Sequence, residues 1–300
     1  MTPTRADVVA AAARIRHHVH RTPVLTSRTI DGLLGAEFHF KCENLQRMGA
    51  FKIRGATNAV RMLPDVVETV ATHSSGNHGA ALALAAAEAG LRAIIVVPSD
   101  ARESKRRAIE RYGAEVVTSA PTLASREATL ERVVADTGAT FVPPYDHADI
   151  IAGAGTSALE LLEQCPGLDQ IWVPVGGGGL AAGTVLAVGD EAQVMLAEPE
   201  LAADAWQSLN SGVLQGAMPP VTVADGLRTA LGKLNFAILR EAGMTVRLAS
   251  EAGIEAWVAR LSAILKVVVE PSAVVTLAAM AENADVARGR VGVILSGGNV

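Results

Sequence analysis

Lys52 has the most distinctive chemical setting of any ionisable side chain in this sequence. It lies between Phe51 and Ile53, shortly after a glycine and just before a run with helical character (residues 55–63). Apolar neighbours make the charged ammonium costly, so its pKa falls and the neutral amine becomes available as a nucleophile. That is what a Schiff-base lysine needs. Taken alone, the stretch favours an ordinary lysine at a helix start, with a packed stem and a solvated head, and only the motifs further along the chain favour the Schiff-base lysine.

Three polar, glycine-rich loops follow predicted strands, at residues 74–79, 176–180 and 296–299. In open parallel sheets, ligands bind outside the carboxyl ends of the strands, which is where each of these loops lies. The run of four glycines can bring backbone N–H groups against an anion, and the following helix adds its positive dipole end. A phosphate is the natural occupant, because four consecutive glycines are entropically costly for a plain turn.

The same glycine run also satisfies a dinucleotide-binding pattern. Gly177, Gly179 and Ala182 match G-x-G-x-x-A after a strand, and Glu198 ends the next strand at about the spacing of a ribose-binding acid. On this local pattern a nicotinamide site is as good as a simpler phosphate site. It explains neither Lys52 nor the loop at 74–79.

The elements that must position these residues alternate between strand and helix, which predicts doubly wound parallel sheets. Residues 143–145 look like a passage from a first lobe back into a second one. Strands are predicted at 37–43, 66–72, 93–97, 114–118, 140–142, 170–175, 194–197, 246–248 and 291–295. Helices are predicted at 5–19, 55–63, 80–89, 102–112, 122–137, 155–164, 181–188, 251–264 and 270–282.

Length, composition, charge and cysteine content indicate a cytoplasmic protein of about two domains. A length of 300 residues suits about two domains, and 50% hydrophobic residues can fill a sizeable core. A net charge of −5 without a basic block argues against nucleic acid or an anionic membrane as partner. Cys42 and Cys165 are too few and too far apart for a disulfide framework. No apolar run reaches ~20 residues, and the N-terminus reads as an amphipathic helix, so neither a membrane span nor a signal peptide is expected.

Five segments taken together resemble the fold-type II pyridoxal-phosphate enzymes, most closely the serine racemase and serine/threonine dehydratase group, which includes threonine ammonia-lyase and 3-hydroxyaspartate dehydratase. They are residues 49–56, 74–79, 151–156, 173–179 and 296–299. The resemblance implies a two-lobed α/β fold like that of the tryptophan synthase β-subunit. It also implies a large cofactor-binding domain (1–66 and 147–300), a small mobile domain (67–146) that closes over the substrate, and a homodimer.

The resemblance also assigns roles around pyridoxal phosphate. Lys52 would hold the cofactor's aldehyde as a Schiff base and then take the substrate Cα proton. The expected cofactor-binding residues are Phe51 and Lys52 at the ring, Asn77 at the ring's 3-hydroxyl, Gly176, Gly177, Gly178, Gly179 and Leu180 at the phosphate, Gly226, and Ser296 at the pyridine nitrogen. A hydroxyl beside that nitrogen weakens the electron sink and suits prompt loss of a β-hydroxyl.

Substrate residues follow from the same resemblance. Ser75 would be the acid/base on the face opposite Lys52, or else bind the substrate carboxylate together with Ser74, Asn77 and His78. The first role would allow racemisation, and the second would leave a pure dehydratase. Arg126 falls where racemase-like members place a cation, which would bind a β-carboxylate through a charge-assisted fork. It also lies on a charged helix face, where most arginines are solvated. Thr229 would line the same pocket.

A divalent-cation site is implied at Glu198, Ala202 and Asp204. Two carboxylates and the Ala202 carbonyl suit Mg²⁺ or Ca²⁺, which prefer oxygen ligands. Acids at a helix N-terminus are the alternative reading.

One position departs from the racemases, which carry an asparagine where this chain has Tyr145. The expected reaction is therefore α,β-elimination from a β-hydroxy amino acid, giving a 2-oxo acid and ammonia. L-Threonine or L-serine is the default substrate, and L-threo-3-hydroxyaspartate or serine racemisation the alternative. A nicotinamide-dependent dehydrogenase and a non-catalytic ligand-binding protein are the alternatives from other classes.

Overall fold

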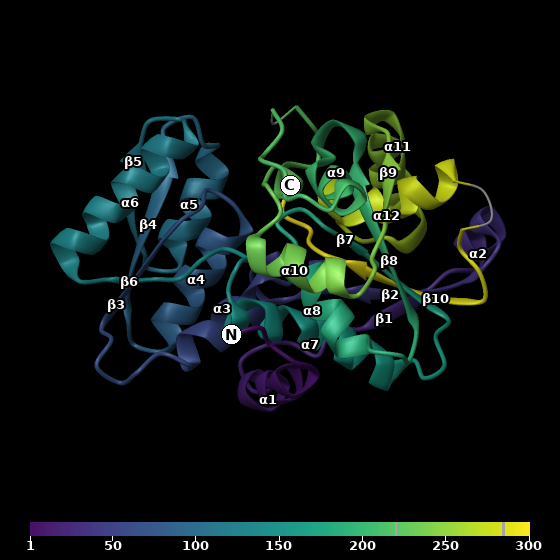
Figure 1. Cartoon of the computed structure of the whole chain (residues 1–300), viewed down its shortest axis with the longest axis horizontal. Coiled ribbons are helices and arrows are strands. Elements are labelled where there is room, and N and C mark those ends of the chain that lie inside the picture. Colours follow the sequence, from purple (N-terminus) through teal and green to yellow (C-terminus); the bar gives the residue numbers. More distant parts are fainter. Residues whose placement is uncertain (220, 284–285) are drawn as a thin grey trace.

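A computed structural model describes residues 1–219, 221–283 and 286–300, which form two α/β lobes, each built around its own sheet (Figure 1). The α/β class expected from the alternating pattern is confirmed. No helix in these described ranges is long and apolar enough to cross a membrane.

The larger sheet has six strands in the order β1-β2-β10-β7-β8-β9. All neighbouring pairs are parallel except β1 with β2. The central strand β7 is buried at every position, because helices cover both faces, and this explains why apolar residues follow one another without alternation after Gln170. The strands are β1 (Val24–Thr26), β2 (Glu37–Cys42), β7 (Gln170–Pro174), β8 (Gln193–Pro199), β9 (Val246–Ala249) and β10 (Arg290–Leu295).

Two apolar clusters sandwich this sheet. One face is covered by α1 (Arg5–Ile15), α7 (Ala148–Gln164), α8 (Gly179–Val188) and α10 (Lys233–Glu241), with α9 (Asp204–Ser211) at its edge. The other is covered by α2 (Arg28–Leu34), α11 (Glu251–Leu265) and α12 (Pro271–Glu282). In Figure 1, α1, α7 and α8 lie below the larger sheet, and α11 and α12 lie above it.

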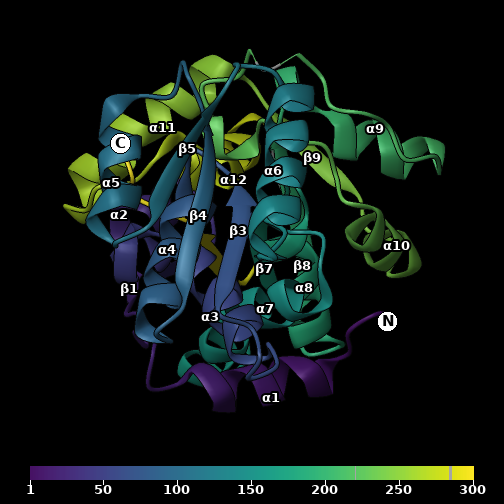
Figure 2. The same cartoon turned by 90° about the vertical axis from the view of Figure 1, so that its left-hand side faces the viewer.

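The smaller sheet has four parallel strands in the order β5-β4-β3-β6. Helices α4 (Asn77–Glu88) and α5 (Glu103–Arg111) pack on one face and α6 (Leu123–Thr137) on the other (Figure 2). The strands are β3 (Thr69–His73), β4 (Arg92–Pro98), β5 (Glu115–Ser119) and β6 (Thr140–Phe141). All four fall within 67–146. The domain boundaries and the movement of this lobe stay predictions.

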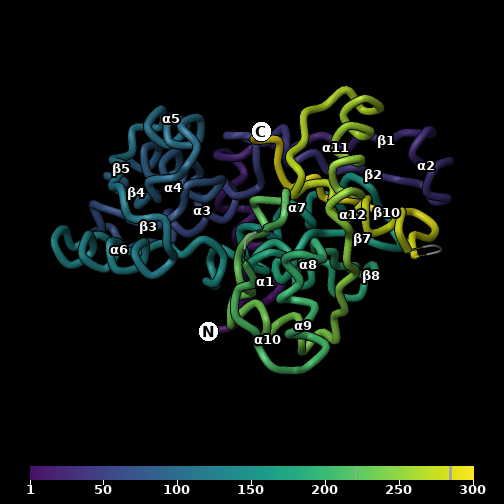
Figure 3. Tube along the Cα trace, turned by 90° about the horizontal axis from the view of Figure 1, so that it is seen from above, coloured from purple at the N-terminus to yellow at the C-terminus, as the bar shows by residue number. Residues whose placement is uncertain are grey.

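Helix α3 (Lys52–Arg61) lies between the lobes, as the view from above shows (Figure 3), and a buried ion network fixes it there. The Arg54 guanidinium, which is fully buried, donates to both carboxylate oxygens of Glu43 at 2.7 and 2.8 Å and to Glu160 on α7 at 2.8 Å. The Lys41 ammonium on β2 donates to the other oxygen of Glu160 at 2.7 Å. Two cations are thus matched by two carboxylates, and together they hold the first turn of α3 against β2 and α7.

Several of the predicted helix boundaries were wrong. The first helix ends at Ile15 rather than residue 19. Helix α7 begins at Ala148 rather than 155, so residues 151–156 are helical, and a side chain at Gly155 would meet the backbone of Gly183 on α8 at 2.5 Å. Helix α4 begins at Asn77, three residues earlier than predicted. Two small elements, α2 and β1, and helix α9 escaped the sequence analysis because each is too short for a clear periodic signal.

Candidate active site

Lys52 is the first residue of α3, and its amine lies beside residues 143–145, the segment that connects the two lobes. Its Nζ donates to the carbonyl of Pro144 at 2.8 Å and lies 5.2 Å from the ring centre of Phe51 and 5.9 Å from that of Tyr145. Burial lowers the pKa of Lys52 to about 8, and the carboxylate of Glu270 partly offsets this shift. The desolvated reading of Lys52 therefore fits the structure better than that of a solvated helix-start cation.

The glycine run forms a bare backbone cradle at the start of α8. Gly176 and Gly178 have left-handed backbones, with φ of 52° and 89°. A Cβ on Gly177 would lie 2.5 Å from the ring of Tyr145, and one on Gly178 would lie 2.5 Å from Leu231. No side chain fits, while the N–H groups at the helix start remain available to an anion. Because Tyr145 contacts both Gly177 and the Lys52 amine, cradle and amine share one site.

The first turn of α4 brings Asn77 to the same site. Its Nδ2 donates to both carboxylate oxygens of Glu270 at 3.1 Å, and its Oδ1 accepts from Nδ2 of Asn299 at 2.8 Å. Burial raises the pKa of Glu270 to about 7, although the bond from Asn77 lowers it in part. Nδ2 carries a second hydrogen. A single hydrogen shared by both Glu270 oxygens would leave the other free to donate, and the predicted bond from Asn77 to a ring oxygen stays a prediction.

Glu270 and Asn299 were missed as site residues. Glu270 lies directly before α12 and follows three valines, and an acid in so apolar a stretch was the available signal. A Cβ on Gly297 would lie 2.6 Å from its carboxylate, and Gly226 lies beside it. The predicted cofactor contacts Gly226 and Ser296 are thus both near Glu270, and Ser296 is buried at the end of β10.

The predicted substrate loop is half-buried at the carboxyl end of β3. Ser74 Oγ accepts from the N–H of Gly76 at 3.3 Å, and within the described ranges the Ser75 hydroxyl makes no hydrogen bond. His78 Nε2 donates to the carbonyl of Val142 at 3.1 Å. Burial lowers the pKa of His78 to about 3, so the ring is neutral at physiological pH. This favours the structural reading of His78.

Arg126 lies in the first turn of α6 and is half-buried. Its positive charge shifts the pKa of two other side chains. Burial lowers the pKa of His73, and the Arg126 guanidinium lowers it further. Burial also raises the pKa of the Tyr145 phenol, and Arg126 partly offsets that shift. Among residues 1–219, 221–283 and 286–300, none forms a hydrogen bond or ion pair with its guanidinium. Thr229 is half-buried, in the loop after the short helix η4 (Asp225–Leu227).

Glu198 and Asp204 form a buried acidic pair. Burial raises the pKa of Glu198 well above its ordinary value, and the charge of Asp204 adds to the shift. Burial likewise raises the pKa of Asp204 to about 6. Glu198 also caps α9, accepting from the N–H of Trp206 at 3.0 Å. Among the described residues, no group of three or more His, Cys, Asp or Glu side chains is placed so that it could hold a metal ion. A cation here would therefore rely on two carboxylates and the carbonyl of Ala202, in the short helix η3 (Glu200–Ala202). That oxygen-only set fits Mg²⁺ or Ca²⁺.

The acidic pair also weakens the nicotinamide reading. Glu198 is fully buried and bonded to the start of α9, so it is not presented to a ribose beside the glycines.

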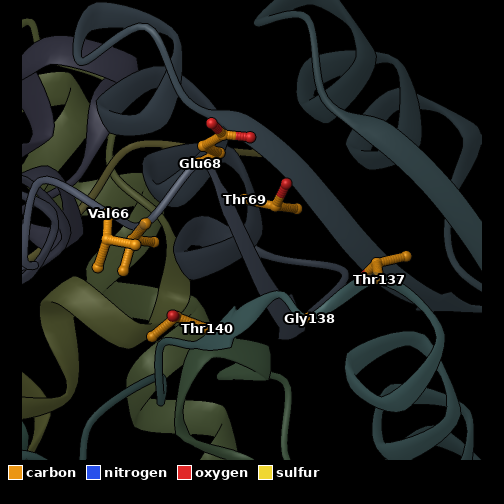
Figure 4. Close-up of a pocket in the computed structure, with 7 residues that line it drawn as sticks. Val66, Glu68, Thr69, Thr137, Gly138 and Thr140 are labelled. Carbon is orange, nitrogen blue, oxygen red and sulfur yellow. The ribbon is translucent and has the colours of Figure 1, made fainter.

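The pocket drawn in Figure 4 lies apart from the candidate active site. It is lined by Val66, Glu68, Thr69, Thr137, Gly138 and Thr140, at the amino ends of β3 and β6, opposite the ends that carry the candidate site.

Comparisons with known proteins all point to one enzyme family. Residues 15–297 match the profile of a family described as "Pyridoxal-phosphate dependent enzyme". The chain is 43% identical to the beta-hydroxyaspartate dehydratase of Paracoccus denitrificans, covering 99% of this chain and 96% of that protein. It is also 43% identical to the L-threo-3-hydroxyaspartate ammonia-lyase of Saccharomyces cerevisiae, covering 100% and 94%. The crystal structure of serine racemase from Dictyostelium discoideum superimposes with a TM-score of 0.93 at 41% identity, covering 100% and 99%.

Proposed function

Because the chain belongs to the pyridoxal-phosphate-dependent enzymes and is a lyase of that family, we propose that it dehydrates L-threo-3-hydroxyaspartate. Elimination of water leaves an enamine, and hydrolysis of its imine form takes up one water and gives ammonia and a dicarboxylic 2-oxo acid. The single observation that carries this choice is Arg126. It is a half-buried cation without a hydrogen-bond or ion-pair partner in the described chain, and its charge lowers the pKa of both His73 and Tyr145. Serine and threonine, the default substrates from sequence, have no second carboxylate to bind it.

The chain's own groups fit the cofactor. The bare glycine cradle and the start of α8 would hold its phosphate, Lys52 its aldehyde, and Phe51 its ring. Asn77, fixed by Glu270, would bind the ring oxygen. When bound, pyridoxal phosphate supplies an electron-withdrawing ring attached to the substrate nitrogen.

The residues of this chain then do the rest of the chemistry. The amine of Lys52 would take the Cα proton, and its lowered pKa leaves it able to accept that proton near neutral pH. The β-hydroxyl departs with a proton as water. Ser74, Ser75 and the N–H groups at the start of α4 bind the α-carboxylate, and Arg126 binds the β-carboxylate. The divalent cation and the homodimer stay predictions.

The test measures 2-oxo acid and ammonia release from L-serine, L-threonine, D-serine and both 3-hydroxyaspartate diastereomers. We expect the highest kcat/KM with the L-threo diastereomer. Arg126→Ala should lower that value roughly 10- to 100-fold, the effect of losing a charged hydrogen bond, and leave L-serine nearly unchanged. Arg132→Ala is the matched control, since Arg132 is an exposed arginine of the same helix. Equal effects of Arg126→Ala on both substrates, or a preference for serine or threonine, would refute the substrate assignment.

A further inference from the structure

The crossover between β6 and α7 is held at three consecutive residues. The carbonyl of Pro144 accepts from Lys52 Nζ at 2.8 Å. The carbonyl of Tyr145 accepts from Asn235 Nδ2 at 3.3 Å. The carboxylate of Asp146 accepts backbone N–H groups from the first turn of α10, the nearest at 2.9 Å. The acceptor for the cofactor lysine is therefore part of a segment that α10 fixes in place.

The same turn of α10 also fixes the glycine cradle. Asn235 Nδ2 donates to the carbonyl of Gly177 at 2.7 Å, and the N–H of Gly232 donates to the same oxygen at 3.1 Å. A Cβ on Gly178 would lie 2.7 Å from Cβ of Asn235, so helix and cradle are in direct contact. One amide nitrogen thus joins the cradle to the crossover.

We propose that Asn235 is a positioning residue of the cofactor site. Its side chain is fully buried. Both neighbours of Nδ2 are carbonyl oxygens, which fixes the orientation of the amide, because only the nitrogen can donate to them. With one hydrogen for each carbonyl, Asn235 sets the distance between the phosphate-binding backbone of Gly177 and the crossover that carries the Lys52 acceptor.

The two carbonyls depend on Asn235 to different degrees. Without its amide, the Gly177 oxygen keeps the N–H of Gly232, whereas no other hydrogen bond to the Tyr145 oxygen is seen in the described residues. A half-buried carbonyl without a donor favours conformations in which it reaches water. The crossover would then shift away from the cradle, and the groups that bind the two ends of the cofactor would lose their fixed separation.

The experiment measures cofactor retention by the holoenzyme. Asn235→Ala should raise the dissociation constant of pyridoxal phosphate roughly 5- to 50-fold, as expected for the loss of one or two buried hydrogen bonds. It is followed through the visible band of the bound cofactor during equilibrium dialysis. Asn235→Asp keeps the volume but turns oxygen toward both carbonyls, so it should weaken cofactor binding at least as much.

Phe236→Leu is the matched control. Phe236 follows on the same helix and packs into the apolar cluster that α10 shares with α8, and its side chain is not among the nearest neighbours of a Cβ built on any cradle glycine. It should lower the thermal midpoint of the cofactor-free chain as much as Asn235→Ala does, yet leave the cofactor dissociation constant within twofold. Equal weakening by Asn235→Ala and Phe236→Leu would reduce Asn235 to a packing residue. If Asn235→Ala does not fold, Asn235→Asp decides, and wild-type cofactor affinity in that variant would overturn the proposal.

Discussion

The reactivity of Lys52 depends on a pKa of about 8, and this value can be tested without substrate. At pH 7 an amine with the ordinary value of 10.5 is roughly 0.03% neutral, whereas one with a pKa of about 8 is roughly 9% neutral. Burial therefore increases the nucleophilic fraction by about 300-fold. Glu270 works in the opposite direction, because its negative charge favours the ammonium form.

The assay is trace acetylation of the full chain freed of cofactor, at pH values from about 6 to 11, with mass spectrometry of the lysine peptides. The labelling rate of Lys52 should rise with pH and level off slightly above pH 8. Glu270→Gln removes a charge that raises the pKa of Lys52, so the Lys52 profile should move to lower pH. A Lys52 labelling rate that continues to rise beyond pH 10, as expected for a lysine with the ordinary pKa of 10.5, or a profile that Glu270→Gln moves to higher pH, would refute the reasoning.

Three further predictions concern the fold, the stereochemistry and the cation. Glu43→Gln removes one of the carboxylates that pair with the buried Arg54 and should lower the free energy of unfolding in urea by about 3–5 kcal/mol. The control Glu163→Gln breaks only an exposed ion pair and should lower it by less than about 1 kcal/mol. Similar losses in the two variants would contradict the role of the buried network. Ser75→Ala should abolish any formation of D-serine from L-serine while L-substrate elimination continues, and an equal loss of both would make Ser75 a binding residue only. Removal of divalent cations by a chelator should lower the thermal midpoint of the wild type but not of Glu198→Gln, and an unchanged wild-type midpoint would count against the cation site.

Much of the site could be predicted because it is encoded locally. A left-handed backbone that no side chain can accompany demands glycine, so the run 176–179 was recognisable as a cradle. Lys52 was recognisable from its apolar neighbours only in combination with the other four segments of the family pattern. The alternation of strands and helices gave parallel sheets, and parallel sheets place their loops at one edge. Helix starts were less certain, because Asn77 and His78 lie in a loop-like motif that continues directly into α4.

The residues that the sequence analysis missed depend on contacts between distant parts of the chain. Glu270 meets Asn77 across 193 positions, and the carbonyl of Pro144 meets Lys52 across 92. Asn235 joins Gly177 across 58 positions. No local sequence pattern marks any of these partners. A backbone carbonyl or a single side-chain amide acquires its role only in the folded chain, where a distant segment packs beside it.

The sequence by itself determined which backbone stretches can bind a phosphate and which lysine can lose its charge, because both follow from neighbours along the chain. The tertiary structure decided what lies opposite them. Strand β10 pairs with β2 and thereby brings the end of the chain against the Lys52 segment, where the N–H of Phe51 donates to the carbonyl of Ser296. Strand order is a property of the whole packed sheet, in which burial is shared among many segments, so no single stretch of sequence specifies it.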